Sequence, residues 1–283
     1  MGDRLGGGPD GRIGLGALAG ELSADGSVSL LSVMTANNEV GTVQPIAEIV
    51  ELVAHLSPAT VVHTDAVAAA PWLDLRHHAG PAHLVSVSAH KVGGPQGIGA
   101  LVVREGTPLA PQLLGGGQER ERRAGTPNLA GAVGFAAALA ATARDREATV
   151  ARVESLRGRL VAGLLAAAPD VVLVSPESPE HRTPGTVLAC FPGVEREALV
   201  FLLDQAGVAA SWGSSCSSGA SEPSHVLTAM GAPPALARGA LRLSLGWCST
   251  DADVDHVLAV LPGAVAQARG AAPDPARPVV ALR

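Results

Sequence analysis

The sequence predicts an α/β fold with a largely parallel, doubly wound sheet in a large domain, followed by a smaller α+β domain. Three observations support this prediction. Short apolar runs of strand length alternate with helical patterns across short connections. A long Ala-rich helical pattern separates two such alternating regions. The composition, 47% hydrophobic with 34 Gly and 21 Pro among 283 residues, is typical of a packed globular chain with many turns.

The first region, expected to form a large domain over residues 1–147, alternates strands with helices and tight turns. A buried strand leads into a polar turn, and Pro45 then opens a helix with apolar residues at helical spacing. The segment GLGALA resembles a dinucleotide-binding pattern, but no apolar strand precedes it, so a turn and a short helix are expected there. The expected strands are 27–34, 60–63, 84–87 and 98–103, and the expected helix is 45–56.

The second region, expected over residues 148–283, begins within a long connecting helix and continues as a small domain. The helical pattern of this connector runs from 127 to about 168. Beyond it, apolar runs and helical patterns alternate again, interrupted by one Gly/Ser-rich loop. The expected strands are 171–174, 185–191, 208–212 and 240–245, and the expected helices are 195–207, 223–230 and 251–268.

The charge balance and the aromatic content exclude several classes of function. With 20 basic and 26 acidic residues the net charge is −6, and a pI of about 5.8 argues against a nucleic-acid partner. Aromatic residues make up only 2%, too few for base-stacking platforms. Neither a basic leader nor an apolar run long enough to span a membrane occurs, so we expect a cytoplasmic protein without a membrane partner. The cysteine spacing is unlike a zinc site, and no metal is expected.

Lys91 is the only lysine among the 20 basic residues of the chain. Arginine serves everywhere else that a surface cation suffices, so a position that keeps lysine is a candidate for chemistry that needs a primary amine. The alternative is an exposed lysine retained by chance on a loop. The flanking sequence, SAHKVGGP, follows a predicted strand and offers a hydroxyl and an imidazole beside the amine.

Asp65 ends the preceding predicted strand, where ligands of parallel sheets bind. On its own, this carboxylate is better explained as a helix N-cap or an Asx turn than as a ligand-binding group. Taken with Lys91, it matches the needs of pyridoxal phosphate (PLP), which requires a lysine amine, a carboxylate for the pyridinium nitrogen and donors for the phosphate. Two successive strand ends supply the first two groups in that order.

Two residues of the second region are further candidates. Cys216 lies in WGSSCSSGAS, a loop expected to be exposed and mobile, which suits a reactive thiol; a small residue in a turn is the alternative. Arg242 interrupts the apolar strand LRLSL, where a charge needs a partner. That partner is either a substrate carboxylate, which a guanidinium holds with two hydrogen bonds, or an acidic residue of the protein.

These segments, in this order, resemble the cysteine desulfurases of the NifS/IscS kind, which are class V aminotransferase-type PLP enzymes of fold type I. The resemblance runs from about Gly11 to Arg269, nearly the whole chain. It implies conversion of L-cysteine to L-alanine, with transfer of the sulfur to acceptors for iron–sulfur cluster assembly or thio-modification. The matching segments are TANNEVGTVQPI, VVHTDAV, SVSAHKVGGPQGIGAL, LGGGQERERRAGT, GSSCSSGASEPSHVL and LARGALRLSLG.

The resemblance also implies a set of residues around the cofactor. Lys91 would carry PLP and then act as the proton-transferring base, and Asp65 would pair with the pyridine nitrogen. Ser88 and His90 would bind the phosphate. Asn38 would contact the cofactor or the substrate.

For the substrate and the sulfur, the resemblance implies roles for residues of the later segments. Arg242 would bind the carboxylate of L-cysteine, and Cys216 would attack its sulfur and become a persulfide. Thr126 would reach the cofactor phosphate of the partner subunit in a homodimer. A sulfur-acceptor or iron–sulfur scaffold protein is the further partner that the resemblance implies.

The sequence departs from the family pattern in two places. It lacks the family's N-terminal portion, which carries a Gly-Thr phosphate turn and a histidine that stacks on the cofactor ring. Ala68 stands where family members place a Gln that contacts the phenolic oxygen of PLP. These departures motivate one alternative function, a shortened, non-catalytic homologue acting as a binding or scaffold protein. A second alternative is another class V aminotransferase or a selenocysteine lyase.

Overall fold

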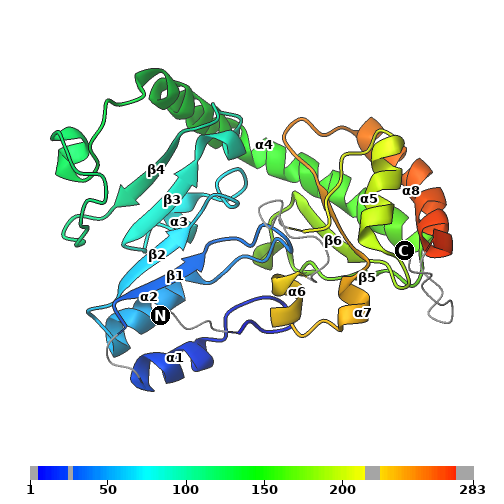
Figure 1. Cartoon of the computed structure of the whole chain (residues 1–283), viewed down its shortest axis with the longest axis horizontal. Coiled ribbons are helices and arrows are strands. Elements are labelled where there is room, and N and C mark those ends of the chain that lie inside the picture. The colour runs from blue at the N-terminus through cyan, green and yellow to red at the C-terminus, as the bar shows by residue number, and fades with distance from the viewer. Residues whose placement is uncertain (1–5, 25–27, 214–223, 272–283) are drawn as a thin grey trace, which may run out of the picture. The chain divides into compact units, whose positions relative to one another are not determined.

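The computed structural model describes residues 6–24, 28–213 and 224–271, which pack into two units (Figure 1). Unit 1 comprises residues 1–6, 12–37 and 43–150, and unit 2 comprises residues 7–11, 38–42 and 151–283. The division runs through one long helix and assigns the short segment 38–42 to unit 2, although its neighbours in the chain belong to unit 1.

Unit 1 is built on a four-stranded sheet of order β1-β2-β3-β4. Strands β1 (Leu30–Met34), β2 (Val61–Asp65) and β3 (Leu84–Ser88) are parallel, as the sequence predicts. Strand β4 (Gly99–Val103) is antiparallel to β3. The largely parallel sheet is thus confirmed for three strands. The fourth reverses because the short connection from β3 contains one 3₁₀ turn and no crossover helix.

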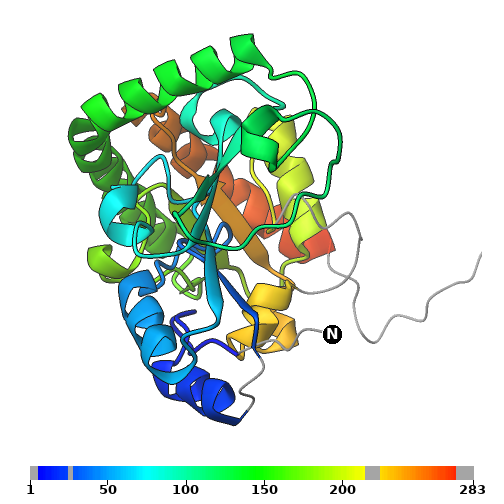
Figure 2. The same ribbon diagram turned by 90° about the vertical axis from the view of Figure 1, so that its left-hand side faces the viewer.

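Helices α1 (Leu15–Ala24) and α2 (Ile46–Leu56) lie side by side in both views of the molecule (Figures 1 and 2). The predicted short helix after the glycine-rich segment is confirmed by α1. In α2 the buried residues Ile46, Ile49 and Val53 recur every three or four positions, so they form one face. This face packs with α1 and with inward-facing residues of the sheet in a single apolar cluster.

Unit 2 contains the antiparallel sheet β5-β6-β7 and the C-terminal half of α4 (Leu129–Ala167). Helices α5 (Arg196–Gln205) and α8 (Asp251–Ala271) pack against each other (Figure 1). Leucines of α4 and α5 share the core of this unit with apolar residues of β6, β7 and α8. The strands are β5 (Val172–Leu173), β6 (Thr186–Cys190) and β7 (Ala240–Ser244).

The prediction of a strand at 208–212 is wrong. Only Ser211 pairs there, in an isolated bridge with Arg242, whose backbone exchanges two hydrogen bonds with it at 3.2 and 2.6 Å. The chain bends at 212 and 213, and the Ser211 hydroxyl donates to the carbonyl of Gly213 at 3.1 Å. The remaining described elements are α3 (Leu75–His78), α6 (His225–Ala229), α7 (Pro234–Ala237) and the 3₁₀ turns η1 (Ala89–Val92), η2 (Gln118–Glu121) and η3 (Pro179–His181). Within the described ranges, no helix combines the length and apolar character needed to cross a membrane.

Candidate active site

The predicted residues of unit 1 gather at one edge of its sheet. Asp65 is the last residue of β2 and Ser88 the last of β3, and the two strands run parallel as neighbours. Asp65 pairs in register with Ser86, so the carboxyl ends of both strands open on the same edge. Ligands of open α/β sheets bind at such an edge.

Asp65 is half-buried, and its Oδ1 accepts a hydrogen bond from the backbone N–H of Val67 at 2.8 Å. The Asx turn considered as an alternative from the sequence is therefore present. It does not exclude a ligand-binding role, because the turn fixes the orientation of the carboxylate where the strand ends. Ala68, which follows in the same turn, has a methyl side chain and provides no hydrogen-bond donor there.

His90 and Lys91 lie on the exposed side of η1, directly after β3. A 3₁₀ turn has three residues per turn, so Ala89 and Val92 fall on its opposite side, where both are buried against Phe135 of α4. The turn ends at Gly93, whose φ of +77° is the left-handed conformation that glycine adopts without strain. The apolar anchors therefore direct the imidazole and the amine outward.

Ser88 and His90 form a hydrogen-bonded pair, with 2.7 Å between the Ser88 Oγ and the His90 Nδ1. The two side chains are thus held together before any ligand binds. The structure brings together four of the predicted site residues in unit 1, namely Asp65, Ser88, His90 and Lys91.

Sequence analysis missed a row of polar side chains that crosses the same sheet. The His63 Nδ1 lies 2.8 Å from the Ser32 Oγ on β1, and its Nε2 lies 2.8 Å from the Ser86 Oγ on β3. His63 precedes Asp65 by two residues in β2, so both point to the same face. The detectable signal was a polar residue two positions before the end of each of three strands.

In unit 2 the structure brings Asn38 and Arg242 together. Arg242 is half-buried in β7, and its Nη1 donates to the backbone carbonyl of Asn38 at 3.0 Å. Asn38 itself is exposed. The Asn38 carbonyl, a neutral acceptor, therefore orients the Arg242 guanidinium, although the two residues are 204 positions apart in the sequence.

Two predicted site residues are not placed with these groups. Thr126 is exposed in the connection between η2 and α4 of unit 1. Cys216 lies outside the described residues. Of the other cysteines, Cys190 is buried in β6 and Cys248 is exposed.

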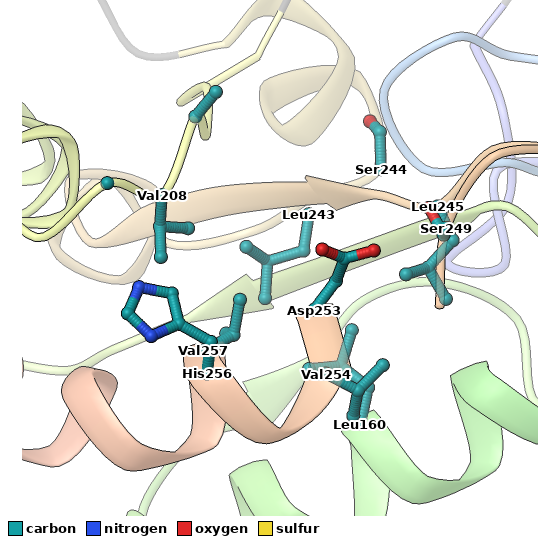
Figure 3. A pocket seen from close by; sticks show the side chains of 12 residues that line it. Leu160, Val208, Leu243, Ser244, Leu245, Ser249, Asp253, Val254, His256 and Val257 are labelled. Atoms are coloured by element: carbon teal, nitrogen blue, oxygen red, sulfur yellow. The ribbon is translucent and has the colours of Figure 1, made fainter. Parts of the chain in front are cut away.

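A small pocket of about 170 Å³ in unit 2 contains none of the predicted site residues. Leu160, Leu243 and Val254 line it together with Asp253 and His256 (Figure 3). Its polar groups already serve the fold. The backbone N–H and hydroxyl of Thr250 donate to Asp253 and hold the pKa of that carboxyl below its ordinary value. His256 contacts the carbonyl of Ala206 at 2.7 Å.

Fold and site together define a class of protein. Residues 6–257 match the family model described as aminotransferase class-V, so the chain belongs to the class-V aminotransferase family. An "IscS-like cysteine desulfurase" from Mycobacterium tuberculosis is 47% identical over 263 residues, which are 93% of this chain and 66% of that protein. This chain therefore spans slightly less than two thirds of the length of that relative.

Solved structures agree with this assignment. A structure titled "NIFS-LIKE PROTEIN" superposes with a TM-score of 0.83 at 32% identity, covering 94% of this chain and 68% of that one. Another, titled "SspA in complex with cysteine", has a TM-score of 0.67 at 28% identity, covering 88% and 67%. The expected PLP-enzyme fold is confirmed.

Proposed function

We propose that this chain is a PLP-dependent cysteine desulfurase that converts L-cysteine to L-alanine and passes the sulfur on as a persulfide of Cys216. The observation that carries the proposal is the arrangement of Asp65, the Ser88–His90 pair and Lys91 at the ends of two adjacent parallel strands. The similarity to an IscS-like desulfurase and to a structure with bound cysteine supports the choice of reaction and substrate.

The residues of unit 1 fit PLP by the chemistry of their side chains. The cofactor needs a primary amine, an anionic partner for its ring nitrogen and donors for its phosphate. Lys91 supplies an exposed amine, Asp65 supplies a carboxylate oriented by its Asx turn, and the Ser88–His90 pair supplies a hydroxyl and an imidazole held 2.7 Å apart. No other lysine in the chain competes for this role.

When bound, PLP supplies an electron sink that labilises bonds to the α-carbon of an amino acid. The residues of the chain do the rest. The Asp65 carboxylate holds the proton on the ring nitrogen, and the Lys91 amine moves protons on the substrate. Arg242, oriented by the carbonyl of Asn38, binds the substrate carboxylate through its guanidinium group. Asn38 is the further contact to cofactor or substrate.

The Cys216 thiolate attacks the sulfur of L-cysteine, forming an S–S bond as the C–S bond of the substrate breaks. The carbon takes a proton and leaves as L-alanine, while Cys216 becomes a persulfide, so no external oxidant or reductant is needed. A sulfur-acceptor or iron–sulfur scaffold protein then takes the terminal sulfur. We further propose a homodimer in which Thr126 contacts the cofactor phosphate of the partner subunit.

A first experiment tests cofactor capture by the full chain. The protein is incubated with PLP, reduced with borohydride and digested, and the modified residue is identified by mass spectrometry. Because the chain has one lysine, a covalent adduct is expected on the peptide with Lys91, and Lys91→Arg, which keeps the charge, should show none there. The absence of an adduct in the wild-type chain would favour a non-catalytic scaffold.

A second experiment tests the reaction. With PLP and L-cysteine, stoichiometric L-alanine and a persulfide on Cys216 are expected. Cys216→Ser should abolish the persulfide and retain PLP capture. Transamination of L-alanine without sulfur release would instead support another class V aminotransferase, and faster turnover of selenocysteine than of cysteine would support a selenocysteine lyase.

A further inference from the structure

Arg157 is a buried cation of unit 2 that none of the roles above employs. It lies in the C-terminal half of α4, next to the core residue Leu156, and it is only 8% exposed. Its Nε is shielded from solvent and has no hydrogen-bond partner among the described residues. No ion pair within that part of the chain includes Arg157 either. Because a guanidinium stays protonated at neutral pH, unit 2 buries a positive charge without a direct partner.

A second buried cation, Arg182, lies near Arg157 and already has its partners. It is 6% exposed, and its two Nη groups donate to the Glu154 carboxylate at 2.6 and 3.0 Å. Its Nε donates to the backbone carbonyl of Glu177 at 3.3 Å, and its backbone forms an isolated bridge with Thr42. These contacts fix the backbone and the guanidinium of Arg182 in one position, together with the carboxylate that it binds.

The cluster formed by Glu154, Arg157 and Arg182 has one carboxylate for two guanidinium groups. Glu154 precedes Arg157 by three positions on α4, so the two residues share one side of the helix. Both carboxylate oxygens of Glu154, however, accept from Arg182. Burial and the nearby charge of Arg182 lower the pKa of Arg157 to about 10, and the opposing effect of Glu154 is smaller. The cluster therefore buries one net positive charge, a destabilising arrangement that an additional anion offsets.

The cluster borders solvent on the side of Glu154. The side chain of Glu154 is 29% exposed, and it lies one helical turn before Arg157. A small anion that approaches along this side reaches the cluster without opening the core of unit 2. The planar guanidinium presents parallel N–H groups that match two oxygens of one ligand, so its geometry favours an oxyanion over a spherical halide ion.

We propose that Arg157 and Arg182 form a binding site for a small oxyanion, either a tetrahedral one such as sulfate or phosphate or a carboxylate, which pairs with Arg157 and stabilises unit 2. Arg182 supplies a second positive charge close by, and Glu154 keeps it in place. These residues all lie within unit 2, and none belongs to the proposed cofactor and substrate sites. The inference therefore does not depend on the proposed function.

Hydrogen exchange of the full chain, without PLP, tests this site. Sodium sulfate replaces sodium chloride at constant ionic strength, and exchange is followed at 151–161 and 177–183. A ligand that binds only the folded state slows exchange through unfolding, so sulfate at about ten times its dissociation constant should slow these amides about tenfold. Arg157→Met should lose this effect. Sulfate also stabilises folded chains generally, because it is excluded from their surfaces, so the difference between the two proteins is the measure of the site.

Arg159→Met is the matched control. It removes the same charge from the same helix, but Arg159 is more exposed and is ion-paired with Asp251 and Asp255. Its exchange should respond to sulfate as the wild type does. Ser88→Ala should also retain the response at 151–161 and 177–183, because an anion bound beside Ser88 would protect unit 1 instead. Equal slowing in the wild type and Arg157→Met would overturn the proposal.

Sodium formate and sodium phosphate distinguish the two sources of the oxyanion. An Arg157-dependent effect of formate alone assigns the site to carboxylates, and an effect of sulfate and phosphate alone assigns it to tetrahedral oxyanions. An effect of all three supports a site for both. If none of the three acts through Arg157, the site does not exist.

Stability in chloride alone provides an independent test. Arg157→Met replaces an unpartnered buried charge with an apolar side chain of similar length, so its midpoint of denaturant unfolding should be at least that of the wild type. A clearly lower midpoint would mean that a group of the chain already pairs with Arg157, and it would overturn the proposal.

Discussion

Cys190 allows a quantitative test of the packing of unit 2. It ends β6, it is 0% exposed, and it lies in an apolar cluster with Val40 and Leu227. Burial in these surroundings raises the pKa of its thiol from 9.0 to about 12. Between these pH values the folded chain binds more protons at Cys190 than the unfolded chain does. The associated stability is therefore fully present below pH 9 and is lost as the pH rises toward 12.

The two pKa values give the size of the effect. Between pH 8 and pH 10 the buried thiol should reduce the free energy of unfolding by about 1.4 kcal/mol, a loss that Cys190→Ala should not show. Denaturant unfolding followed by circular dichroism at pH 8, 9 and 10 measures it. The cavity left by the substitution lowers stability equally at each pH, so the difference between the two proteins isolates the thiol.

Arg157 makes the free energy of unfolding depend on pH in the opposite direction. This contribution cancels when the wild type is compared with Cys190→Ala, because both proteins contain Arg157. Burial, together with the nearby charge of Arg182, lowers the pKa of Arg157 to about 10. The unfolded chain therefore binds more protons at this residue above pH 10, and its contribution to stability rises with pH in both proteins alike. Cys248→Ala is a second control, because its thiol is exposed. Parallel curves for the wild type and Cys190→Ala would refute the reasoning.

Three further predictions concern the site and its supports. Asp65→Asn keeps an oxygen that can accept from Val67, so the fold should survive, while alanine release falls roughly a hundredfold from loss of the charged partner of the cofactor; an equally large loss of stability by denaturant unfolding would contradict this. Val92→Ala removes an apolar anchor of η1, so it should lower the free energy of unfolding by about 2 kcal/mol and weaken PLP capture. Val133→Ala, at an exposed position of α4, is the control and should change neither quantity. Buried Arg182 donates to the Glu154 carboxylate at 2.6 and 3.0 Å, and Glu154→Gln removes the charge of this partner. The free energy of unfolding should therefore fall by about 3 kcal/mol, and the double variant that also carries Arg182→Met should recover most of this loss.

The secondary structure was largely predictable because it follows from local patterns. The helix opened by Pro45 and the strand that ends at Asp65 are both present, since the first depends on spacing every three or four residues and the second on a short apolar run. The direction of β4 was predictable in principle as well. Only ten residues separate Ser88 from Gly99, and a parallel crossover needs a dozen or more.

The wrong prediction of a strand at 208–212 and the unforeseen hydrogen bond between Ser224 and Glu39 have a common cause. Whether an apolar run becomes a strand depends on a partner for its backbone, and here only Ser211 finds one, on β7. Likewise, the Glu39 and Ser224 side chains are bonded across 185 positions of the sequence, a separation that no local pattern encodes. The candidate cofactor residues of unit 1 could be predicted, because each lies at a strand end or directly after it, and the apolar runs of the sequence indicate where these strands end.

The contacts of the segment 38–42 explain why a contiguous run, and not one isolated residue, is needed at this point of the chain. The Asn38 carbonyl holds Arg242, the Glu39 carboxylate holds Ser224, and Val40 is buried beside Leu227. Gly41 follows with a φ of +81°, and a Cβ there would lie 3.0 Å from Thr186, so glycine is required both for its conformation and for its size. Each residue thus makes a different contact within unit 2. A shift of this run by one position would therefore displace both the proposed substrate-binding arginine and the N-cap residue of α6.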